Sequence, residues 1–334
     1  MRYIVLGAGA IGGVTAAFMT KGGCDVTVVC RNEKTAKALC APGLKITGRR
    51  GEATVPLAAV CGTAELSGKY DCCIVATKAY DTVQAVSSLI PYLSDDGIVL
   101  VLQNGICIDA LLSVLPAHNA ACGVTTWSCT MISPTHMDFT GEGGFIIGMA
   151  KGGEDARLAR IRDDMSLAAE TKISENIIAD MYSKLIINSG ITCGGALTGQ
   201  LLGQMLKGKD ARKFFIAIVY EAMAVAEAID LKVPPFGGKL DYYKFISGSS
   251  IFDNIRRHAM LFVVGVKYRK LKSSSLTSLQ RGKPTEVSAL NGWICKKADE
   301  YGVCVPVNKK LCELISEIEA GKRKSTPENL KYLI

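Results

Sequence analysis

Six residues near the start of the chain combine the types and the spacing that bind a phosphate group. The motif is Gly7-Ala8-Gly9-Ala10-Ile11-Gly12, after an apolar strand expected at residues 3–6. The first glycine permits a tight turn, the second lets the backbone approach a pyrophosphate, and the third lets the following helix pack on the strand. Free N–H groups at the start of that helix favour an anion. The motif predicts dinucleotide binding by Gly7, Gly9, Ala10, Ile11 and Gly12; an accidental glycine turn is the alternative.

The residue that follows the second expected strand, at residues 25–29, indicates which dinucleotide is bound. Sites for NAD place Asp or Glu there, where the carboxylate binds the ribose 2′-hydroxyl. This chain has Cys30-Arg31-Asn32 instead, with Glu33 two residues beyond the expected position. A guanidinium group can pair with a 2′-phosphate, which a carboxylate would repel. Arg31 therefore favours NADPH/NADP+ as the cofactor, with an unliganded surface arginine as the alternative.

Lys184 and Asn188 lie four residues apart in a segment of helical periodicity. At that spacing both side chains project from one face of the helix, and the residues between them are apolar. Such a lysine either extends its ammonium group to the surface or serves a site. Lys184 and Asn188 are therefore candidate site residues.

A polar segment in the second half of the chain holds another candidate. It is rich in Ser and Thr from Ser273 onward and ends in Pro284-Thr285-Glu286. Gly282 is expected to end one helix, and Pro284 and Thr285 to begin the next. Glu286 would then lie in the first helical turn, where the helix dipole favours an ionised carboxylate. The alternative is a glutamate that only starts a helix.

Strands and helices alternate through the N-terminal half. Strands are expected at residues 72–76 and 98–102, with a helix over residues 82–93 between them. Ligands of open α/β sheets lie beyond the carboxyl ends of the strands. Lys78 and Asn104 follow these two strands, so they are expected to face a cofactor or substrate. Residues 123–148 predict an antiparallel, mixed edge to the sheet.

Strand signals fade beyond residue 172, and the second half is expected to be helical. The expected helices cover residues 176–188, 214–229, 286–300 and 307–320. The chain thus divides into an α/β Rossmann-like dinucleotide-binding domain, residues 1–172, and an all-α substrate and catalytic domain, residues 173–334. Such a pair of domains implies a cleft between them.

The composition excludes several classes of protein. The 334 residues, 49% hydrophobic and 21% charged, are typical of a globular chain longer than one average domain of ~150 residues. No apolar run approaches the ~18 residues that span a bilayer, so a membrane protein is excluded. The thirteen cysteines form no Cys-x-x-Cys pair, which indicates free thiols in a reducing cytoplasm. The three histidines form no metal-binding cluster, so no metal is expected.

Charge is distributed unevenly along the chain. Residues 1–170 hold 14 Lys and Arg against 16 Asp and Glu, and the remaining residues hold 25 against 15. A basic second half suits an anionic small ligand or an acidic partner, although most of these residues are expected on a solvated surface. No nucleic-acid-binding motif accompanies the charge, so nucleic acid is not expected as a partner.

Taken together, these motifs resemble the ketopantoate reductases (2-dehydropantoate 2-reductases), which are NADPH-dependent enzymes of two domains. The resemblance covers essentially the whole chain, and the combination in this order is specific. Beyond the glycine loop and Arg31, it rests on Thr77-Lys78-Ala79, Gln103-Asn104-Gly105, Gly123-Val124-Thr125-Thr126, Lys184-Leu185 with Asn188, the segment from Ser274 to Glu286, Asn291-Gly292, and Gly302-Val303-Cys304-Val305-Pro306-Val307-Asn308.

The resemblance implies a role for each matching residue. Lys184 matches the catalytic lysine that gives a proton to the reduced carbonyl, and Glu286 matches the glutamate that binds the substrate's hydroxyl region. Ser274 matches a serine that binds the substrate carboxylate, and Asn188 matches a substrate-binding asparagine. Asn104 and Lys78 match residues between cofactor and substrate, and Arg31 matches the ligand of the 2′-phosphate.

Three departures from the family pattern concern the substrate. Where family members have a second asparagine, this chain has Thr192, followed by Cys193-Gly194-Gly195. The shorter Thr192 takes that place in the substrate site, and the two glycines are expected to empty volume beside it. Ser278 replaces a common aspartate. The segment 236–272 is a basic insert, which could be a lid or an interface.

The expected activity is NADPH-dependent reduction of a branched 2-oxo acid, with 2-dehydropantoate to pantoate, a step of pantothenate biosynthesis, as the first candidate. Two alternatives remain: a related D-2-hydroxyacid dehydrogenase acting on another bulky 2-oxo acid, which Thr192 favours, and a non-catalytic NADP(H)-binding regulator on the same fold. A small-molecule 2-oxo acid is the expected partner, without nucleic acid or membrane, and a homodimer is left open.

Overall fold

A computed structural model describes residues 1–334. The chain divides into two compact units: an α/β unit, Met1–Gln103 with Cys107–Asp180, and a helical unit, Asn104–Ile106 with Met181–Ile334. The division lies beyond the boundary predicted after residue 172, because strand β12 (Thr171–Ile173) pairs with the sheet of the α/β unit. Ser174 then donates a hydrogen bond to Asp180 at 2.5 Å, which ties the following turn to the same unit.

The α/β unit is built on an eight-stranded sheet with the order β12-β11-β8-β7-β6-β1-β2-β5. Six consecutive strands, from β8 to β5 in this order, pair in parallel, whereas β11 runs antiparallel to β8. This confirms the mixed edge expected from residues 123–148. The strands are β1 (Arg2–Leu6), β2 (Asp25–Cys30), β5 (Ala58–Cys61), β6 (Tyr70–Val75), β7 (Leu93–Val101), β8 (Ala120–Thr125), β11 (Phe145–Met149) and β12.

A second, four-stranded sheet was not expected as such, although two of its strands lie in the segment 123–148 that was expected to be antiparallel. Its strands are β3 (Leu44–Gly48), β4 (Ala53–Val55), β9 (Ser128–Ser133) and β10 (His136–Gly141), in the order β4-β3-β10-β9. The central pair, β3 with β10, joins residues about 90 positions apart in the chain. Short strands paired at such a distance carry little local signal, which is why the periodicity did not reveal them.

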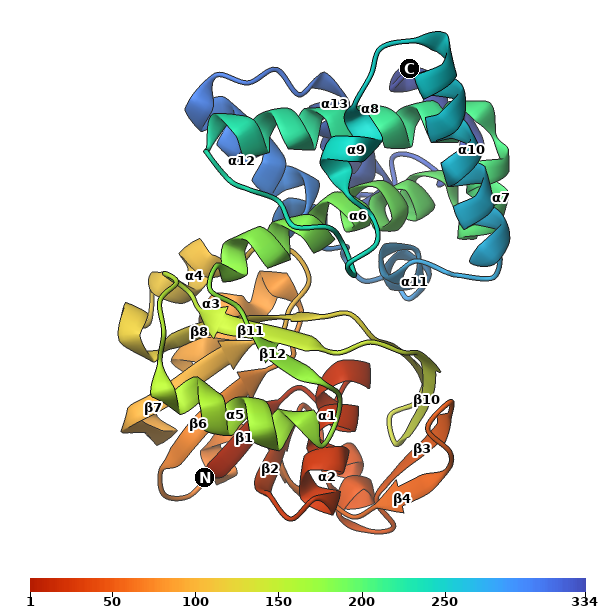
Figure 1. The fold of residues 1–334 in the computed structure, drawn as a ribbon. Helices are drawn as coiled ribbons and strands as arrows, with labels where there is room; N and C mark the ends of the chain where they lie inside the picture. Colours follow the sequence, from red (N-terminus) through yellow and green to blue (C-terminus); the bar gives the residue numbers. More distant parts are fainter. The chain divides into compact units, whose positions relative to one another are not determined.

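Helices flank the strands of the α/β unit (Figure 1). They are α1 (Ala10–Lys21), α2 (Glu33–Cys40), α3 (Thr82–Ser87), α4 (Ile108–Leu112) and α5 (Ala156–Ser166). The helix expected over residues 82–93 is shorter than predicted. It ends at Ser87, Pro91 lies in the 3-10 turn Ile90–Tyr92, and β7 begins at Leu93. Proline has no backbone N–H and cannot continue a helix.

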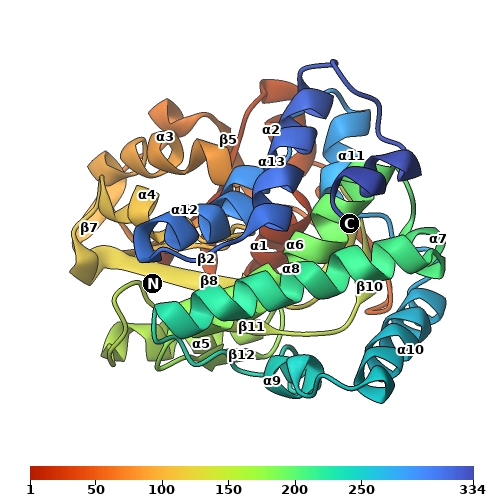
Figure 2. The same ribbon diagram turned by 90° about the horizontal axis from the view of Figure 1, so that it is seen from above.

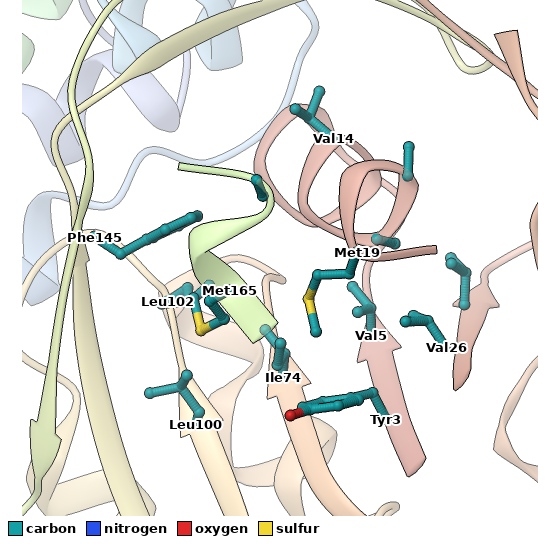
Figure 3. Packing of buried hydrophobic residues seen from close by; sticks show 14 of the residues in the cluster. Tyr3, Val5, Val14, Met19, Val26, Ile74, Leu100, Leu102, Phe145 and Met165 are labelled. Atoms are coloured by element: carbon teal, nitrogen blue, oxygen red, sulfur yellow. The ribbon is translucent and has the colours of Figure 1, made fainter. Parts of the chain in front are cut away.

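The core of the α/β unit lies between one face of the large sheet and helices α1 and α5 (Figure 3). Alternate strand residues such as Tyr3, Val5 and Ile74 point into it, while Ile4 and Cys73, one position along, are buried on the opposite face. The Tyr3 hydroxyl donates a hydrogen bond to Asp164 of α5 at 2.6 Å. Because both faces of the sheet are buried, these strands appear in the sequence as continuous runs of apolar residues.

The helical unit is arranged around α8, which packs on α6, α7, α9, α10, α12 and α13 (Figure 2). Glu221 of α8 accepts hydrogen bonds from the backbone N–H groups of Val307 and Asn308 at 2.8 and 2.9 Å, so it caps the start of α13. None of the helices combines the length and the apolar composition that are needed to span a bilayer. The helices are α6 (Ile177–Thr198), α7 (Leu202–Lys207), α8 (Lys209–Ala228), α9 (Tyr242–Ile246), α10 (Ile251–Lys267), α11 (Ser274–Gln280), α12 (Asn291–Tyr301) and α13 (Pro306–Glu319).

The helix expected to start before Glu286 begins later. Glu286 precedes a 3-10 turn, Val287–Ala289, and α12 begins only at Asn291. The carbonyl of Ala289 accepts a hydrogen bond from Ile106 N–H at 3.1 Å. The Ala289 carbonyl therefore accepts its hydrogen bond from a distant segment. Glu286 does not lie in the first turn of an α-helix, so the predicted effect of the helix dipole on its carboxylate does not apply.

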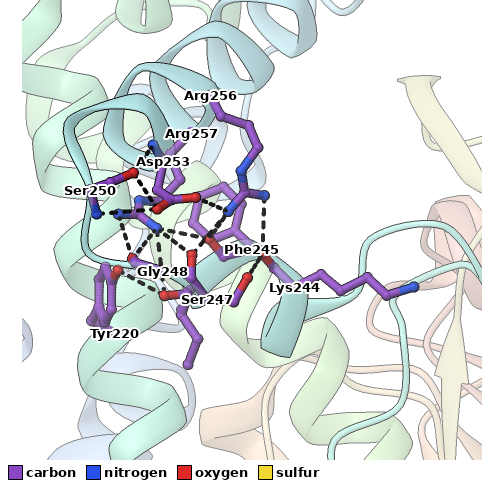
Figure 4. A network of polar contacts seen from close by, with 10 residues as sticks. Tyr220, Lys244, Phe245, Ser247, Gly248, Ser250, Asp253, Arg256 and Arg257 are labelled. Carbon is purple, nitrogen blue, oxygen red and sulfur yellow. Dashed lines mark hydrogen bonds and ion pairs between the residues drawn. The ribbon is translucent and has the colours of Figure 1, made fainter.

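The basic insert, residues 236–272, forms the short helix α9 and the longer α10. Arg257, 5% exposed, donates hydrogen bonds to the carbonyls of residues 245–248 that end α9, at 3.1 to 3.5 Å (Figure 4). Arg256 donates to the carbonyls of Lys244 and Ser247 at 3.0 and 3.1 Å. Two of the insert's positive charges therefore satisfy backbone carbonyls of the insert itself.

The glycine loop between β1 and α1 is closely packed at its third glycine. A Cβ atom at Gly12 would lie 2.1 Å from the carbonyl oxygen of Gly7 and 2.9 Å from the Cβ of Ala76. At Gly9 a Cβ would meet no atom within 4 Å. The lack of a side chain therefore has a different consequence at each glycine. At Gly12 it lets the helix approach the strand, and at Gly9 it leaves open space beside the loop.

We expect Gly12→Ala to destabilise the protein by about 2 kcal/mol or more, since backbone atoms that cannot move aside block the added methyl group. Gly9→Ala is the matched control and should change the free energy of unfolding by less than about 0.5 kcal/mol. Urea denaturation followed by circular dichroism measures both. Equal stability of the two variants would contradict this account of the loop.

Candidate active site

Four neighbouring parallel strands of the α/β unit, β7-β6-β1-β2, end at one edge of the sheet. Within three residues after these strands end, the chain carries Gln103, Thr77-Lys78, Gly7 and Arg31 respectively. Carboxyl ends of parallel strands meet at the same edge, which is where open α/β sheets bind ligands. The structure therefore brings together at this edge the glycine loop, Arg31 and Lys78, as expected from the sequence.

The loop at this edge fits the pyrophosphate of a dinucleotide. Gly7 has φ +109°, in the region that favours glycine, and a Cβ there would lie 3.0 Å from the backbone of Ala76. Gly9 is the N-cap of α1, and Ala10 and Ile11 are its first residues, without an acidic side chain in the first turn. An open position at Gly9 and unopposed N–H groups at the start of a 12-residue helix suit an anion.

Arg31 lies beside an acidic residue that the sequence did not single out. Its Nη2 atom is 2.5 Å from Oδ2 of Asp81, which belongs to the 3-10 turn Ala79–Asp81 after β6. The Arg31 side chain remains 73% exposed. The guanidinium group is thus accessible to a ligand, but it already has an anionic partner.

Gln103 holds the loop that carries Lys78, a role that the sequence did not assign. Its amide donates to the carbonyl of Lys78 at 3.0 Å and to the Thr77 hydroxyl at 3.1 Å, and its oxygen accepts from Thr82 at 2.7 Å. Gln103 is buried. The Gln-Asn-Gly motif in the sequence could have indicated this role. Only Asn104 of that motif was interpreted as a site residue.

Asn104 belongs to the helical unit, although it directly follows a strand of the α/β unit. With Gly105 and Ile106 it packs on the 3-10 turn after Glu286, where Ile106 N–H donates to Ala289. A Cβ at Gly105, where φ is +83°, would lie 2.3 Å from the Ala289 oxygen. The close approach made possible by this glycine places Asn104 in the unit that also holds Lys184 and Glu286.

Lys184 lies in α6, partly buried between the fully covered Ser183 and Leu185. Burial lowers the pKa of its ammonium group from 10.5 to about 8, and the negative charge of Glu286 opposes this effect. Asn188 follows one turn later and is also partly buried. A lysine with its pKa close to neutrality, beside a carboxylate, can act as a general acid.

Glu286 is 3% exposed, and its segment is held by α13. The backbone N–H of Thr285 donates to Glu319 at 2.6 Å. Burial raises the pKa of the Cys193 thiol, and the nearby carboxylates of Glu286 and Glu319 raise it further. The structure thus brings Glu286 near α6 at both Lys184 and Cys193, although the two segments are about 100 residues apart.

Ser273, adjacent to the predicted Ser274, connects α6 with α11. Its hydroxyl donates to the carbonyl of Thr192 at 3.1 Å and accepts from the N–H of Leu276 at 3.1 Å, so it also caps α11. Ser274 is the first residue of α11 and is exposed. Ser273 therefore fixes where Ser274 lies relative to Thr192, which is itself buried.

The two glycines after Thr192 do not leave empty volume, so this expectation was wrong. A Cβ at Gly195 would lie 2.6 Å from the Ser273 hydroxyl oxygen, and one at Gly194 would lie 3.0 Å from both Met205 and Phe214. The missing side chains make room for neighbours from α7, α8 and the segment before α11. What distinguishes this part of the site is therefore Thr192 itself.

Comparison with known proteins identifies the family. The family model described as "Ketopantoate reductase PanE/ApbA" matches residues 3–152, and its C-terminal counterpart matches residues 176–319. A 2-dehydropantoate 2-reductase of Pyrococcus abyssi is 29% identical over 332 residues, covering 97% of this chain and 100% of the relative. That of Halobacterium salinarum is 26% identical, covering 94% and 98%.

Solved structures show the same fold. A ternary complex of D-mandelate dehydrogenase with NADH and anilino(oxo)acetate has a TM-score of 0.82 at 22% identity, covering 96% of this chain and 99% of its own. A PanE/ApbA family ketopantoate reductase from Ralstonia eutropha has a TM-score of 0.81 at 24% identity, covering 97% and 100%. Both halves of the chain match the family in order. The chain therefore belongs to the ketopantoate reductase family and is an oxidoreductase that acts on a CH–OH group.

Proposed function

We propose that the protein reduces a branched 2-oxo acid to its 2-hydroxy acid with NADPH, and that 2-dehydropantoate (ketopantoate), reduced to pantoate for pantothenate biosynthesis, is the substrate. The observation that carries this proposal is the partly buried Lys184, with Glu286 near it and a pKa close to neutrality. The names of the relatives from Pyrococcus and Halobacterium support the substrate. The exposed Arg31 at the end of β2 supports NADPH.

In the proposed reaction, a bound reduced nicotinamide supplies a hydride to the carbonyl carbon of the 2-oxo acid. Negative charge then develops on the carbonyl oxygen, where Lys184 stabilises it and donates a proton. Glu286 keeps Lys184 charged and binds the hydroxyl region of the substrate. Asn104, Asn188 and Thr192 position the substrate, and Ser274 binds its carboxylate. The α/β unit holds the cofactor through the glycine loop, Arg31 and Lys78.

A D-2-hydroxyacid dehydrogenase for another bulky 2-oxo acid is the second candidate. Thr192 favours it, because a threonine reaches less far than the asparagine common in the family. The structural likeness to D-mandelate dehydrogenase, at 22% identity, supports the fold only.

The thirteen free cysteines support a reducing cytoplasm as the place of the reaction.

We also propose that the protein forms a homodimer through α10. One face of this helix is apolar and exposed, with Phe252 at 78%, Ile255 at 58%, Val263 at 63% and Val266 at 56% exposure. Contiguous exposed apolar faces mark interaction sites. The spacing is symmetric about Ala259: residues 252 and 266 lie seven positions from it, and residues 255 and 263 lie four.

This symmetry favours a second copy of the chain as the partner. In an antiparallel pair of α10 helices, Ile255 would face Val263 of the other copy, and Ala259 would allow close approach at the centre. A membrane surface is less well matched, since Arg256 and Arg257 along the helix bond backbone carbonyls.

The first prediction from this function concerns proton donation. We expect the rate of 2-oxo acid reduction to fall as the pH rises above about 8, because Lys184 then loses its proton. Glu286→Gln should move this fall to lower pH, since the carboxylate raises the lysine pKa. Lys184→Ala should lower turnover by about 10² or more while NADPH still binds.

Oxidation of NADPH, followed by its absorbance over a range of pH, measures these effects, and cofactor fluorescence measures binding. Lys207→Ala, an exposed lysine of α7, is the matched control and should behave like the wild type. Normal turnover of Lys184→Ala, or an unchanged pH profile in Glu286→Gln, would remove these residues from the proposed roles.

The second prediction concerns the substrate. Sites that pair a substrate hydroxyl reject the deoxy analogue by about 10⁴ or more. Because Thr192 is short, we expect a smaller preference for ketopantoate over 3,3-dimethyl-2-oxobutanoate than in typical family members, and Thr192→Asn should enlarge it. Thr192→Val, which removes only the hydroxyl, is the control for size. The measurement is the ratio of kcat/KM for the two acids, in the wild type and in each variant. Strong wild-type selectivity for ketopantoate would contradict the prediction.

The third prediction concerns the dimer. Ile255→Glu and Val263→Lys should each give monomers, because each buries a charge in the α10 pair, and the double variant should restore the dimer by pairing the two charges. Val83→Glu, which changes an exposed apolar residue of α3, should leave the mass unchanged. Sedimentation velocity measures the mass. A monomeric wild type would refute the dimer, and its binding to anionic vesicles would assign α10 to a membrane surface instead.

A further inference from the structure

The ion pair between Arg31 and Asp81 joins a residue expected to read the cofactor to one with no assigned role. Asp81 is the N-cap residue of α3, a position where an aspartate usually accepts a hydrogen bond from the start of the helix. Its side chain makes no such bond, and Oδ2 instead lies 2.5 Å from Nη2 of Arg31. The carboxylate is therefore placed at the end of β2, although it comes from the loop after β6.

The backbone around Asp81 is well held. Its N–H donates to the carbonyl of Lys78 at 2.9 Å, and the same carbonyl accepts from Gln103 at 3.0 Å. The next residue, Thr82, is buried and bonds both Ala79 and Gln103, each at 2.7 Å. The Asp81 side chain is 26% exposed, against 73% for Arg31. The acidic partner is thus the more constrained of the two.

Glu33, another carboxylate close to Arg31 in the sequence, has a different partner. It lies in the first turn of α2 and pairs with Lys37 at 2.6 Å, four residues along the same helix. The end of β2 therefore lacks a carboxylate of its own but receives one from a neighbouring loop. A carboxylate at this place binds the 2′-hydroxyl of NADH and repels the 2′-phosphate of NADPH.

We propose that Asp81 is a specificity-determining residue that weakens binding of the 2′-phosphate and gives the enzyme use of NADH as well as NADPH. The proposal rests on the proposed function in one respect, that Arg31 faces the adenosine ribose. NADPH would bring its 2′-phosphate beside the Asp81 carboxylate as well as the Arg31 guanidinium, so repulsion between the two anions offsets part of the attraction to Arg31. NADH carries no such charge, and the carboxylate can accept a hydrogen bond from its ribose hydroxyl.

The test is Asp81→Asn, which keeps the size of the side chain and removes its charge. We expect the variant to bind NADPH about tenfold more tightly and NADH about threefold more weakly, the size of effect expected for one charged contact. Asp25→Asn is the matched control. It removes the carboxylate from another exposed ion pair, that with Arg2, at the opposite end of β2, and should change neither affinity.

Arg31→Ala shows whether the effect passes through the arginine. This variant should bind NADPH about 10- to 100-fold more weakly, with NADH nearly unaffected, and Asp81→Asn should then add less than in the wild-type background. Titration of each protein with NADPH and NADH, followed by fluorescence, gives all the dissociation constants without a substrate. Failure of the enzyme to reduce any 2-oxo acid would refute the proposed function but leave this comparison intact. Equal changes for both cofactors in Asp81→Asn, or none, would overturn the role of Asp81.

Discussion

Placing the Lys184 ammonium group among apolar residues costs free energy, and the negative charge of Glu286 offsets part of that cost. Burial alone would drive the lysine toward its neutral form. Glu286 opposes this, and Glu286 is in turn positioned by contacts from distant segments: Glu319 bonds Thr285, and Ile106 bonds Ala289. The balance leaves a lysine that can exchange its proton near neutral pH, which is the property a general acid needs.

The α/β unit places backbone N–H groups and positively charged side chains at one edge of its sheet. Parallel pairing brings four strand ends together, and the close contact at Gly12 allows α1 to begin directly behind β1. Gln103 fixes the next loop through three hydrogen bonds. The same loop carries Asp81, whose carboxylate pairs with Arg31. The hydrogen bonds that hold this loop therefore also determine the charge next to Arg31.

The surface of the helical unit adds a feature unrelated to the chemistry. The inner side of α10 packs on α7, where Gly265 lies against Leu206 and Gly203. Its outer side keeps Phe252, Ile255, Val263 and Val266 exposed. An exposed apolar face on a helix is typical of one that packs against a further body, and this is the physical basis of the proposal that α10 forms an interface between copies.

The local patterns of the sequence were sufficient for the elements that depend on near neighbours. Glycine spacing predicted the β1–α1 loop, a four-residue spacing placed Lys184 and Asn188 on one helix, and the mixed sheet edge was also correct. The family motifs then supplied roles for residues that periodicity could not interpret. Contacts between distant segments were decided only by the tertiary structure: the start of α12 after Glu286, the β3–β10 pair, Ser273 in the space beside Gly195, Asn104 in the helical unit, and Asp81 on Arg31. Each of these depends on which atoms meet across about 50 or more residues of chain, and the periodicity of a sequence reports only on neighbours within a few turns.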